Sequence, residues 1–467
     1  MLPEQFLTRM EELLGGEYDV FLESYERERY QALRINPAKT DRERFLGQAP
    51  FTLTPVAWEK NGFYYESTDA PGRHPYHEAG VYYIQEPSAM APAALLMEEA
   101  AEDGMEHRVL DLCAAPGGKS TQIASYMKGK GILICNEIHP ARAKILSENV
   151  ERMGIRNAIV TNETPQKLAE HFPVYFDRIL VDAPCSGEGM FRKNEEAREE
   201  WSPENVALCA KRQDEILDCA AEMLMPGGTM VYSTCTFAPD ENEGSMERFL
   251  ERHPEFSLQK LTPANGMTAG MLEGTIRLYP HHLNGEGHFL AMLRKEGEVV
   301  YPLFSSEEPI AASKDKKSAG KEYPEFLEFA GESLKGDWNG RFLTFGDQLY
   351  RTPAGMPSLR GLKVLRPGLH LGTMKKNRFE PSHALALALR PEEVLHTVDF
   401  CSGEVTEADG ERKFVPGREI MAYLNGQSFP MEGEKGWYLV TVDGYSIGWG
   451  KLAGTMLKNH YPKGLRK

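Results

Sequence analysis

Two cysteines that could act as nucleophiles follow directly on apolar segments of the chain. Cys185 lies in "LVDAPCSGEGMF" (180–191), and Cys235 lies in "VYSTCTFAPDENE" (231–243). In both segments a run typical of a buried strand gives way to a polar loop. Cysteine is usually a small buried apolar side chain, and a loop position with polar company weakens that interpretation. The two thiols are therefore candidate catalytic groups.

The other five cysteines point to packing. We expect Cys209 and Cys219, which share one predicted helix, and Cys135 and Cys401 to be small buried side chains, and we expect Cys113 to pack under the glycine loop that it begins. The total of seven is odd, and the chain has no C-x-x-C and no Cys/His cluster along the sequence. We predict neither a disulfide framework nor a metal site, and a reduced cytoplasmic setting follows.

A glycine loop, "DLCAAPGGKST" (111–121), lies between a predicted strand and a predicted helix. It resembles the phosphate loop G-x-x-x-x-G-K-[ST], but Cys113 occupies the place of the first glycine. The loop also lacks G-x-G-x-x-G, so a dinucleotide is not favoured. Gly117 and Gly118 would let a ligand approach the backbone at the carboxyl end of the strand.

Three acids lie at predicted strand ends around this loop. Asp111 opens the loop, Glu137 ends the second strand at the distance expected for an acceptor of ribose hydroxyls, and Asp182 ends the fourth strand. Each acid alone is also compatible with a helix cap or a surface group. As a set they would repel a pyrophosphate and suit a cation. S-adenosylmethionine carries a sulfonium and an ammonium, so we predict it as the cofactor.

A thiolate beside a methyl donor has a specific use on pyrimidines. Carbon 5 of cytosine is a poor nucleophile until sulfur adds to carbon 6, which splits one hard step into easier ones. Asp182 could act on the ring-nitrogen edge and stabilise the charge that develops. One cysteine suffices to attack and a second could assist breakdown of the adduct. The residues themselves leave open whether Cys185 or Cys235 attacks.

The elements that must position these groups alternate between strand and helix. We predict strands at 108–113, 131–137, 157–161, 178–184 and 228–235, and helices at 119–129, 139–154 and 202–228. This alternation is typical of a parallel α/β sheet with helices on both faces. A hairpin formed by 275–281 and 288–295 is expected to close the sheet edge.

Composition and charge fit a soluble chain of several domains. The 467 residues are 41% hydrophobic and 26% charged; no apolar run approaches the ~20 residues that cross a bilayer, and the N-terminus does not resemble a signal peptide. The net charge is −16, yet residues 341–467 hold 18 Lys and Arg against 13 Asp and Glu. This asymmetry is compatible with a C-terminal module that meets phosphate or with a solvated basic tail.

Three stretches carry a resemblance to a known family. "CAAPGGK" (113–119), "DAPCSGEG" (182–189) and "YSTCT" (232–236) resemble the Sun-type RNA cytosine-5 methyltransferases. With "LRINP" (33–37) and "GWGK…KNHYPKGLR" near the end, nearly the whole chain is similar to the bacterial ribosomal small-subunit methyltransferase F type. The resemblance implies that Cys235 is the nucleophile and that Cys185 aids product release. DNA cytosine methyltransferases reverse these roles.

The resemblance also implies a set of cofactor contacts and a fold. A further acid is expected after the third strand, where "VTNETP" aligns Thr164, with Asn162 and Glu163 beside it. The predicted S-adenosylmethionine contacts are Cys113, Ala114, Ala115, Pro116, Gly117, Gly118, Lys119, Glu137, Thr164 and Asp182. We expect an α/β chain with a Rossmann-like class I methyltransferase sheet, a small α+β N-terminal domain and a β-rich PUA-like C-terminal module.

These expectations define domains and partners. The predicted parts are an N-terminal RNA-binding domain (1–104), the methyltransferase core (105–297), a linker (298–325), an intermediate domain (326–395) and a PUA-like RNA-binding domain (396–467). The expected partner is ribosomal RNA or the small ribosomal subunit, with no membrane and no metal. Two alternatives stay open: a non-catalytic RNA-binding assembly factor with a vestigial cofactor pocket, and a tRNA or DNA cytosine-5 methyltransferase.

Overall fold

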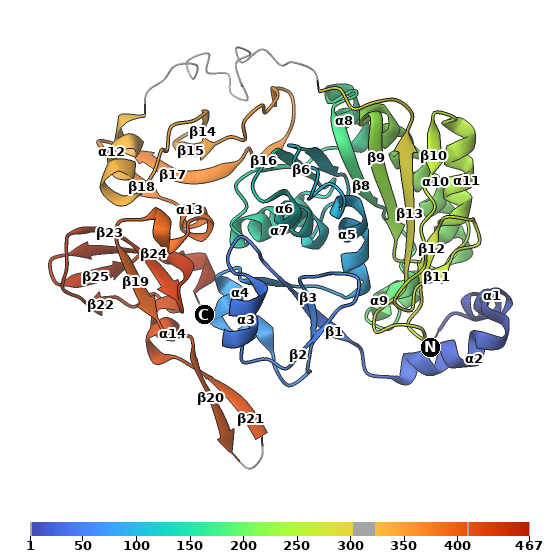
Figure 1. The fold of residues 1–467 in the computed structure, drawn as a ribbon, viewed down its shortest axis with the longest axis horizontal. Helices are drawn as coiled ribbons and strands as arrows, with labels where there is room; N and C mark the ends of the chain where they lie inside the picture. The colour runs from blue at the N-terminus through green and yellow to red at the C-terminus, as the bar shows by residue number, and fades with distance from the viewer. Residues whose placement is uncertain (1, 302–322, 409–410, 467) are drawn as a thin grey trace.

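The computed structural model describes residues 2–301, 323–408 and 411–466, except for the side chains of 407–412. The predicted linker (298–325) falls mainly on 302–322, outside the described residues. Figure 1 shows an N-terminal part, a central sheet covered by helices, and two β-rich C-terminal parts. No helix of the described residues is long and apolar enough to cross a membrane.

The N-terminal part joins a helical arm to a small sheet. The arm consists of α1 (Glu4–Leu14), η1 (Gly15–Glu17), α2 (Tyr18–Glu23) and η2 (Ser24–Glu26). The sheet has the order β2 (Leu53–Pro55), β3 (Gly62–Tyr65), β1 (Gln31–Ile35) and β4 (Tyr82–Ile84). The connecting helices are α3 (Arg42–Gln48), η3 (Pro71–Arg73), α4 (Pro75–Glu78) and η4 (Ser88–Met90). This mixture confirms the predicted α+β character.

The central sheet has the order β11-β12-β13-β9-β8-β5-β6-β7-β16, with β10 paired to β13. Its parallel strands are β5 (Arg108–Asp111), β6 (Ile132–Asn136), β7 (Ala158–Thr161), β8 (Phe176–Asp182) and β9 (Leu224–Thr234). The others are β10 (Phe256–Leu258), β11 (Thr268–Ala269), β12 (Ile276–Leu278), β13 (His288–Lys295) and β16 (Val364–Arg366). The predicted α/β sheet is confirmed.

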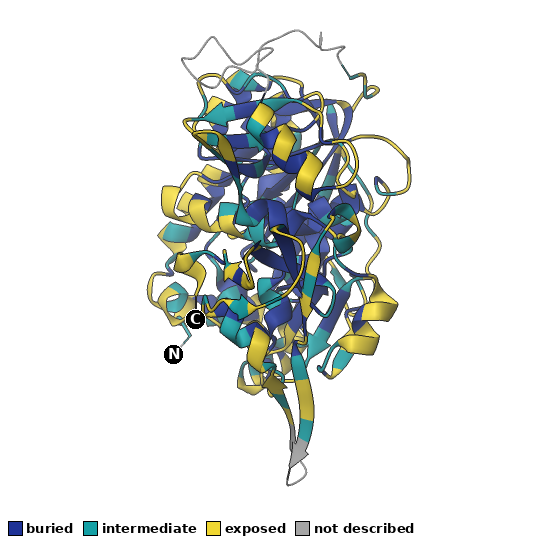
Figure 2. Cartoon of the chain, turned by 90° about the vertical axis from the view of Figure 1, so that its left-hand side faces the viewer, coloured by how far each residue is buried: buried dark blue, intermediate teal, exposed yellow. Residues whose placement is uncertain are grey.

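Helices bury both faces of this sheet. One face packs on α5 (Ala91–Met97), α6 (Gly118–Met127) and α7 (Pro140–Arg152). The other packs on α8 (Pro165–His171), α10 (Pro203–Met223) and α11 (Glu243–Arg252), while α9 (Glu195–Glu199) and η5 (Glu188–Met190) lie in the loop after β8. Figure 2 shows the sheet interior as the darkest region. Successive strand residues point to opposite faces, so Val109 packs on the first set and Leu110 on the second.

Two features of the sheet edges differ in detail from the sequence prediction. The predicted hairpin forms, but β13 lies between β12 and β9 and runs antiparallel to both, so the hairpin extends the sheet rather than capping it. At the opposite edge, β16 pairs antiparallel with β7. Its three residues are too short to show a strand pattern in the sequence.

The C-terminal parts are β-rich. The first has strands β14 (Phe342–Phe345), β15 (Gln348–Arg351), β17 (Leu369–Lys375) and β18 (Arg378–Pro381), with α12 (Pro324–Ser333) and α13 (His383–Ala388). The second has η6 (Pro391–Glu393), β19 (Thr397–Phe400), β22 (Phe429–Pro430), β23 (Gly436–Val442), β24 (Tyr445–Ala453), β25 (Met456–Asn459), α14 (Arg418–Leu424) and η7 (Lys463–Leu465). A hairpin of β20 (Gly403–Ala408) and β21 (Glu411–Pro416) projects from it (Figure 1).

The last module packs directly on the N-terminal domain, although the two are far apart in sequence. The Tyr76 hydroxyl donates to Asp443 Oδ2 at 2.8 Å, and the hydroxyls of Thr40 and Tyr445 lie 2.9 Å apart. Their apolar residues form one buried cluster. The small N-terminal sheet and its helices therefore pack against the last module, as the neighbouring blue and red parts of Figure 1 show.

Candidate active site at the carboxyl ends of the strands

The structure brings the two predicted cysteines together. Cys235 directly follows β9, and Cys185 lies three residues after β8. Because β8 and β9 are neighbouring parallel strands, both cysteines lie at the carboxyl ends of the strands. Their sulfur atoms lie 3.0 Å apart, and the Cys235 amide donates to Cys185 Sγ at 3.3 Å. The contact with Cys235 and burial raise the pKa of the Cys185 thiol. Cys185 therefore holds a proton beside the sulfur of Cys235.

Glu188 ties the two cysteine loops together. Its carboxylate accepts from the Phe237 amide at 3.1 Å and from the Trp201 indole at 2.8 Å, and it pairs with Arg9 of α1. The Glu188 side chain is completely buried. Since a buried carboxylate needs such partners, these contacts fix the Cys185 loop against the Cys235 loop and against the N-terminal arm.

Glu241 braces the Cys185 loop from the other side. Its Oε2 accepts from the Ser186 amide at 3.0 Å and from Gln213 Nε2 at 2.8 Å. Its Oε1 is buried without a hydrogen-bond partner among the described residues. Burial raises the pKa of this carboxyl to about 7, against an ordinary value of 4.5. Glu241 therefore binds a proton more tightly in the folded chain than in the unfolded one.

This shift predicts how stability depends on pH. Between pH 4.5 and about 7 the unfolded chain loses the Glu241 proton first, so the free energy of unfolding falls as pH rises, by on the order of 3 kcal/mol in total. Glu241→Gln is expected to remove this contribution. Denaturant unfolding at a series of pH values would measure it, with exposed Glu247→Gln as the control. An unchanged pH slope in Glu241→Gln would contradict the assignment.

Asp182 and Lys119 form an ion pair beside the thiols. Lys119 Nζ donates to Asp182 Oδ2 at 2.7 Å, and Ser233 Oγ donates to Oδ1 at 2.7 Å. Burial would raise the pKa of Asp182, but Lys119, His288 and Ser233 outweigh it and the pKa is lowered. Asp182 is thus a carboxylate in this site. Lys119, which the resemblance placed among the S-adenosylmethionine contacts, directs its ammonium to Asp182.

The glycine loop passes between the strands and α6 as predicted. Its Ala115–Pro116 peptide bond is cis, and Gly117 has φ +114°, a conformation that favours glycine. A Cβ on Gly117 would also lie 3.2 Å from a Leu146 methyl group. Gly118 begins α6, and its carbonyl accepts from the buried guanidinium of Arg34 at 3.2 Å. Arg34, from the "LRINP" stretch, thereby anchors the loop to the N-terminal domain.

The three acids surround this loop. Asp111 is fully buried, its Oδ2 accepts from Ser120 Oγ at 2.6 Å, and burial raises its pKa to about 7. Its Oδ1 is buried without a partner among the described residues. Burial raises the pKa of the neighbouring Cys113 thiol, and the negative charges of Asp111, Asp182 and Glu137 raise it further. The loop therefore lies in a negative field, which suits a cationic ligand.

Glu137 and its neighbours define the ribose end of the predicted pocket. Glu137 Oε1 accepts from the His139 amide at 2.9 Å, and Oε2 lies 3.5 Å from Arg142 Nη1. Asn162 donates to the Glu137 carbonyl at 2.7 Å and is buried next to it. Thr164 is exposed and caps α8, with Oγ1 accepting from the Lys167 amide at 3.2 Å. Of the residues weighed after the third strand, the structure sets Asn162 beside Glu137.

His288 is a site residue that sequence reasoning missed. It begins β13, and because Phe289 pairs with Thr234, His288 stands opposite Cys235 in register. It is 4% exposed, and its Nδ1 has no partner among the described residues. Burial and the charge of Lys119 lower its pKa. The sequence placed His288 in the predicted hairpin. Its position opposite Cys235 depends on the pairing of β13 with β9, and this strand order is not visible in the sequence.

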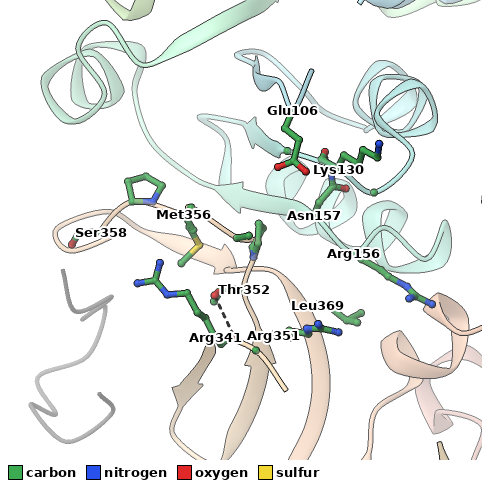
Figure 3. A pocket seen from close by; sticks show the side chains of 17 residues that line it. Glu106, Lys130, Arg156, Asn157, Arg341, Arg351, Thr352, Met356, Ser358 and Leu369 are labelled. Carbon is green, nitrogen blue, oxygen red and sulfur yellow. Dashed lines mark hydrogen bonds between the residues drawn. The ribbon is translucent and has the colours of Figure 1, made fainter. Parts of the chain in front are cut away.

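A large cavity among the described residues lies elsewhere. It measures about 800 Å³ and is lined by residues that precede the central strands, among them Glu106 before β5, Gly131 before β6 and Asn157 before β7. Figure 3 shows Lys130, Arg156, Arg341 and Arg351 around it. Glu106, Gly131 and Asn157 lie at the amino ends of the central strands, and the cysteines lie at the carboxyl ends. In open α/β sheets ligands bind at the carboxyl ends, so this cavity is not the predicted cofactor pocket.

Family models match most of the chain. They are "16S rRNA methyltransferase RsmB/F" over residues 99–294, "N-terminal domain of 16S rRNA methyltransferase RsmF" over 2–87, "RsmF rRNA methyltransferase first C-terminal domain" over 328–389 and "Methyltransferase RsmF PUA domain" over 415–467. Together with the mixed sheet and its glycine loop, these matches define the chain as a methyltransferase with a β-rich PUA domain.

The relatives narrow this class. The ribosomal RNA small subunit methyltransferase F proteins of Escherichia coli O17:K52:H18 (strain UMN026 / ExPEC) and of Escherichia coli (strain SE11) are each 33% identical to the chain, over 99% of its length and 96% of theirs. The chain belongs to the ribosomal RNA small subunit methyltransferase F family.

Solved structures agree on the fold. A methyltransferase homolog from Pyrococcus horikoshii has a TM-score of 0.55 and 27% identity, covering 63% of this chain and 95% of that one. The structure of NSun6 from Pyrococcus horikoshii with SFG has a TM-score of 0.54 and 21% identity, covering 63% and 99%. At this identity the second likeness concerns the fold alone.

Proposed function

We propose that the chain transfers a methyl group from S-adenosylmethionine to carbon 5 of a cytosine in ribosomal RNA of the small subunit, in the cytoplasm. The observation that carries the proposal is the pair of sulfur atoms 3.0 Å apart, next to the partly buried Asp182–Lys119 ion pair. An RNA-binding module without catalysis has no use for this arrangement. Membership of the family and the names of the relatives support RNA of the small subunit as the substrate.

The covalent step uses the two thiols in different roles. Cys235 sulfur adds to carbon 6 of the cytosine, and carbon 5 becomes an enamine carbon that accepts the methyl group. A base then removes the carbon 5 proton, the sulfur–carbon bond breaks, and the ring recovers its aromaticity. We assign the nucleophile to Cys235. Cys185, whose pKa is raised, keeps its proton beside that sulfur and assists the release.

Asp182 and Lys119 hold the target base in this proposal. Because Asp182 is ionised, it can accept a hydrogen bond from the exocyclic amino group of cytosine. The ammonium of Lys119, 2.7 Å from Asp182, supplies positive charge where the ring becomes negative as sulfur adds. This refines the expectation that Asp182 alone stabilises the developing charge.

The glycine loop and the acids around it fit the methyl donor. The negative field at Cys113 suits a sulfonium and an ammonium, and the buried, unpartnered Asp111 Oδ1 is an acceptor at this loop. When bound, S-adenosylmethionine supplies an electrophilic methyl group. We assign its contacts to residues 113–119, Glu137 and Asp182. At the third strand we assign Asn162 in place of Thr164, because the Asn162 side chain donates to the Glu137 carbonyl.

The ribose contact gives a measurable prediction. Glu137→Gln is expected to weaken S-adenosylmethionine binding by about 10-fold, since a charge-assisted hydrogen bond to a hydroxyl contributes about 1.5 kcal/mol. Isothermal titration calorimetry would measure the Kd. Glu148→Gln, at an exposed position of α7, should bind like the wild type. Equal affinity in Glu137→Gln would argue against this pocket.

We assign RNA binding to the N-terminal domain and to the C-terminal PUA domain. The PUA domain presents exposed basic residues at Lys451, Lys458, Lys463 and Arg466. Because this module packs on the N-terminal domain, both would contact RNA around a flipped-out cytosine, through phosphate and shape.

The decisive experiment is methyl transfer to the proposed substrate. Tritium from labelled S-adenosylmethionine should enter unmethylated small ribosomal subunits or their RNA, and bisulfite sequencing should find the product as 5-methylcytosine. Methyl transfer to transfer RNA or to DNA, and not to the small subunit or its RNA, would show that the proposed substrate is wrong. Binding to the subunit without any transfer would favour a non-catalytic assembly factor.

A further inference from the structure

A group of metal-ligating side chains lies outside the catalytic site. Glu17 of η1, His281 and His282 present one ligand atom each within 4.8 Å of one another. His282 Nε2 lies 3.1 Å and His281 Nε2 3.4 Å from the same atom, Glu17 Oε2. Glu17 and His281 are 264 residues apart in the chain, so the spacing of residues along the sequence could not reveal this group.

The distances match a tetrahedral coordination shell. Zinc bonds imidazole nitrogen and carboxylate oxygen at about 2.0–2.2 Å, so neighbouring ligand atoms of a tetrahedron lie about 3.3–3.6 Å apart. The two measured nitrogen–oxygen distances fall close to this spacing. Glu17 is exposed, so water could supply a fourth ligand to a cation held by these three atoms.

The protonation of the histidines also suits a metal. Metals bind neutral imidazole. The His281 side chain is 1% exposed, so a charged imidazolium there would be poorly solvated. The two rings lie with their centroids only 4.0 Å apart, so two imidazolium charges would repel each other. His281 Nδ1 is buried without a hydrogen-bond partner among the described residues. No hydrogen bond at Nδ1 therefore holds the ring in a single orientation toward Glu17.

We propose that Glu17, His281 and His282 form a binding site for a divalent transition-metal cation, with Zn²⁺ the best match to the ligand set. Two imidazoles and one carboxylate are a combination that zinc takes in proteins. The proposal concerns a site distinct from the catalytic cysteines and does not depend on the methyl-transfer reaction.

The position of the site suggests what the metal would do. Glu17 belongs to the N-terminal arm, whereas the two histidines belong to the loop that leads into β13. Phe21 of α2 packs on both His281 and Phe237, with ring centroids 5.6 Å and 5.5 Å apart. A bound cation would therefore fasten the arm to the loop that precedes His288.

Zinc titration of the full-length, tag-free chain after EDTA treatment tests the site. Because thiolates are also zinc ligands, the titration uses Cys185→Ser/Cys235→Ser. We expect one Zn²⁺ per chain and a higher Tm with zinc. His282→Ala and Glu17→Gln should each weaken zinc binding at least about 10-fold, because even the loss of an outer-shell partner costs metal sites about 10- to 100-fold. Both residues are exposed enough for the variants to fold.

A matched control comes from a second histidine–glutamate pair. His396 Nε2 lies 3.6 Å from Glu434 Oε2, and this pair has one imidazole where the proposed site has two. His396→Ala should leave zinc affinity and stoichiometry unchanged. X-ray absorption of the zinc-loaded chain should show two imidazoles and light-atom ligands. No zinc bound at one equivalent, or equal affinity in His282→Ala and the parent, would overturn the proposal.

Discussion

Cys235→Ala is expected to lower the rate of methyl transfer by roughly 10⁴- to 10⁶-fold, the range seen when a covalent nucleophile is removed. Without this sulfur no bond forms to carbon 6, so carbon 5 stays unreactive. The variant should still bind S-adenosylmethionine, because the residues assigned to the donor lie on the glycine loop and at the ends of β6 and β8. Single-turnover tritium transfer and calorimetry would separate the two effects.

A control for this prediction is available in the same chain. Cys401, which we expected to be buried, is an exposed free cysteine whose Sγ donates to the Gly403 carbonyl at 3.5 Å, so Cys401→Ala should retain wild-type activity. Cys235→Ser should be almost as inactive as Cys235→Ala, because a hydroxyl is far less nucleophilic than a thiolate at neutral pH. Full turnover by the serine variant would end the mechanism proposed for Cys235.

Cys185→Ala is expected to trap the covalent intermediate. The nucleophile remains, so the bond to carbon 6 still forms, but its partner thiol 3.0 Å away is gone and breakdown slows. Loss of a positioned acid or base typically costs about 10²- to 10⁴-fold, so turnover should fall by that factor. An enzyme–RNA complex should accumulate and survive denaturing gel electrophoresis, whereas the wild type should show little.

The double variant decides between the two cysteines. Cys185→Ala/Cys235→Ala should form no stable complex, because the trapped bond requires Cys235. If Cys235→Ala accumulates the complex and Cys185→Ala abolishes it, the roles are exchanged, as in the DNA enzymes. Thermal unfolding would measure separately any change that these substitutions make to the stability of the protein. Both cysteines are partly exposed.

Local sequence patterns determined the elements and the groups that carry the chemistry. Alternating apolar runs and amphipathic stretches predicted the five parallel strands, because hydrophobic periodicity depends on neighbours along the chain. The same holds for the glycine loop, Glu137, Asp182 and the two cysteines at strand ends. These residues were predictable because strand ends of a parallel α/β sheet share one edge.

Tertiary structure decided which groups meet. Three sets of contacts join residues from different strands and loops. Lys119 donates to Asp182, and the strand register sets His288 opposite Cys235. Glu188 and Glu241 hold the cysteine loops in place. Such contacts depend on strand order, which a single sequence does not encode locally. The group of Glu17, His281 and His282 forms for the same reason, because packing brings the N-terminal arm to a loop 264 residues away.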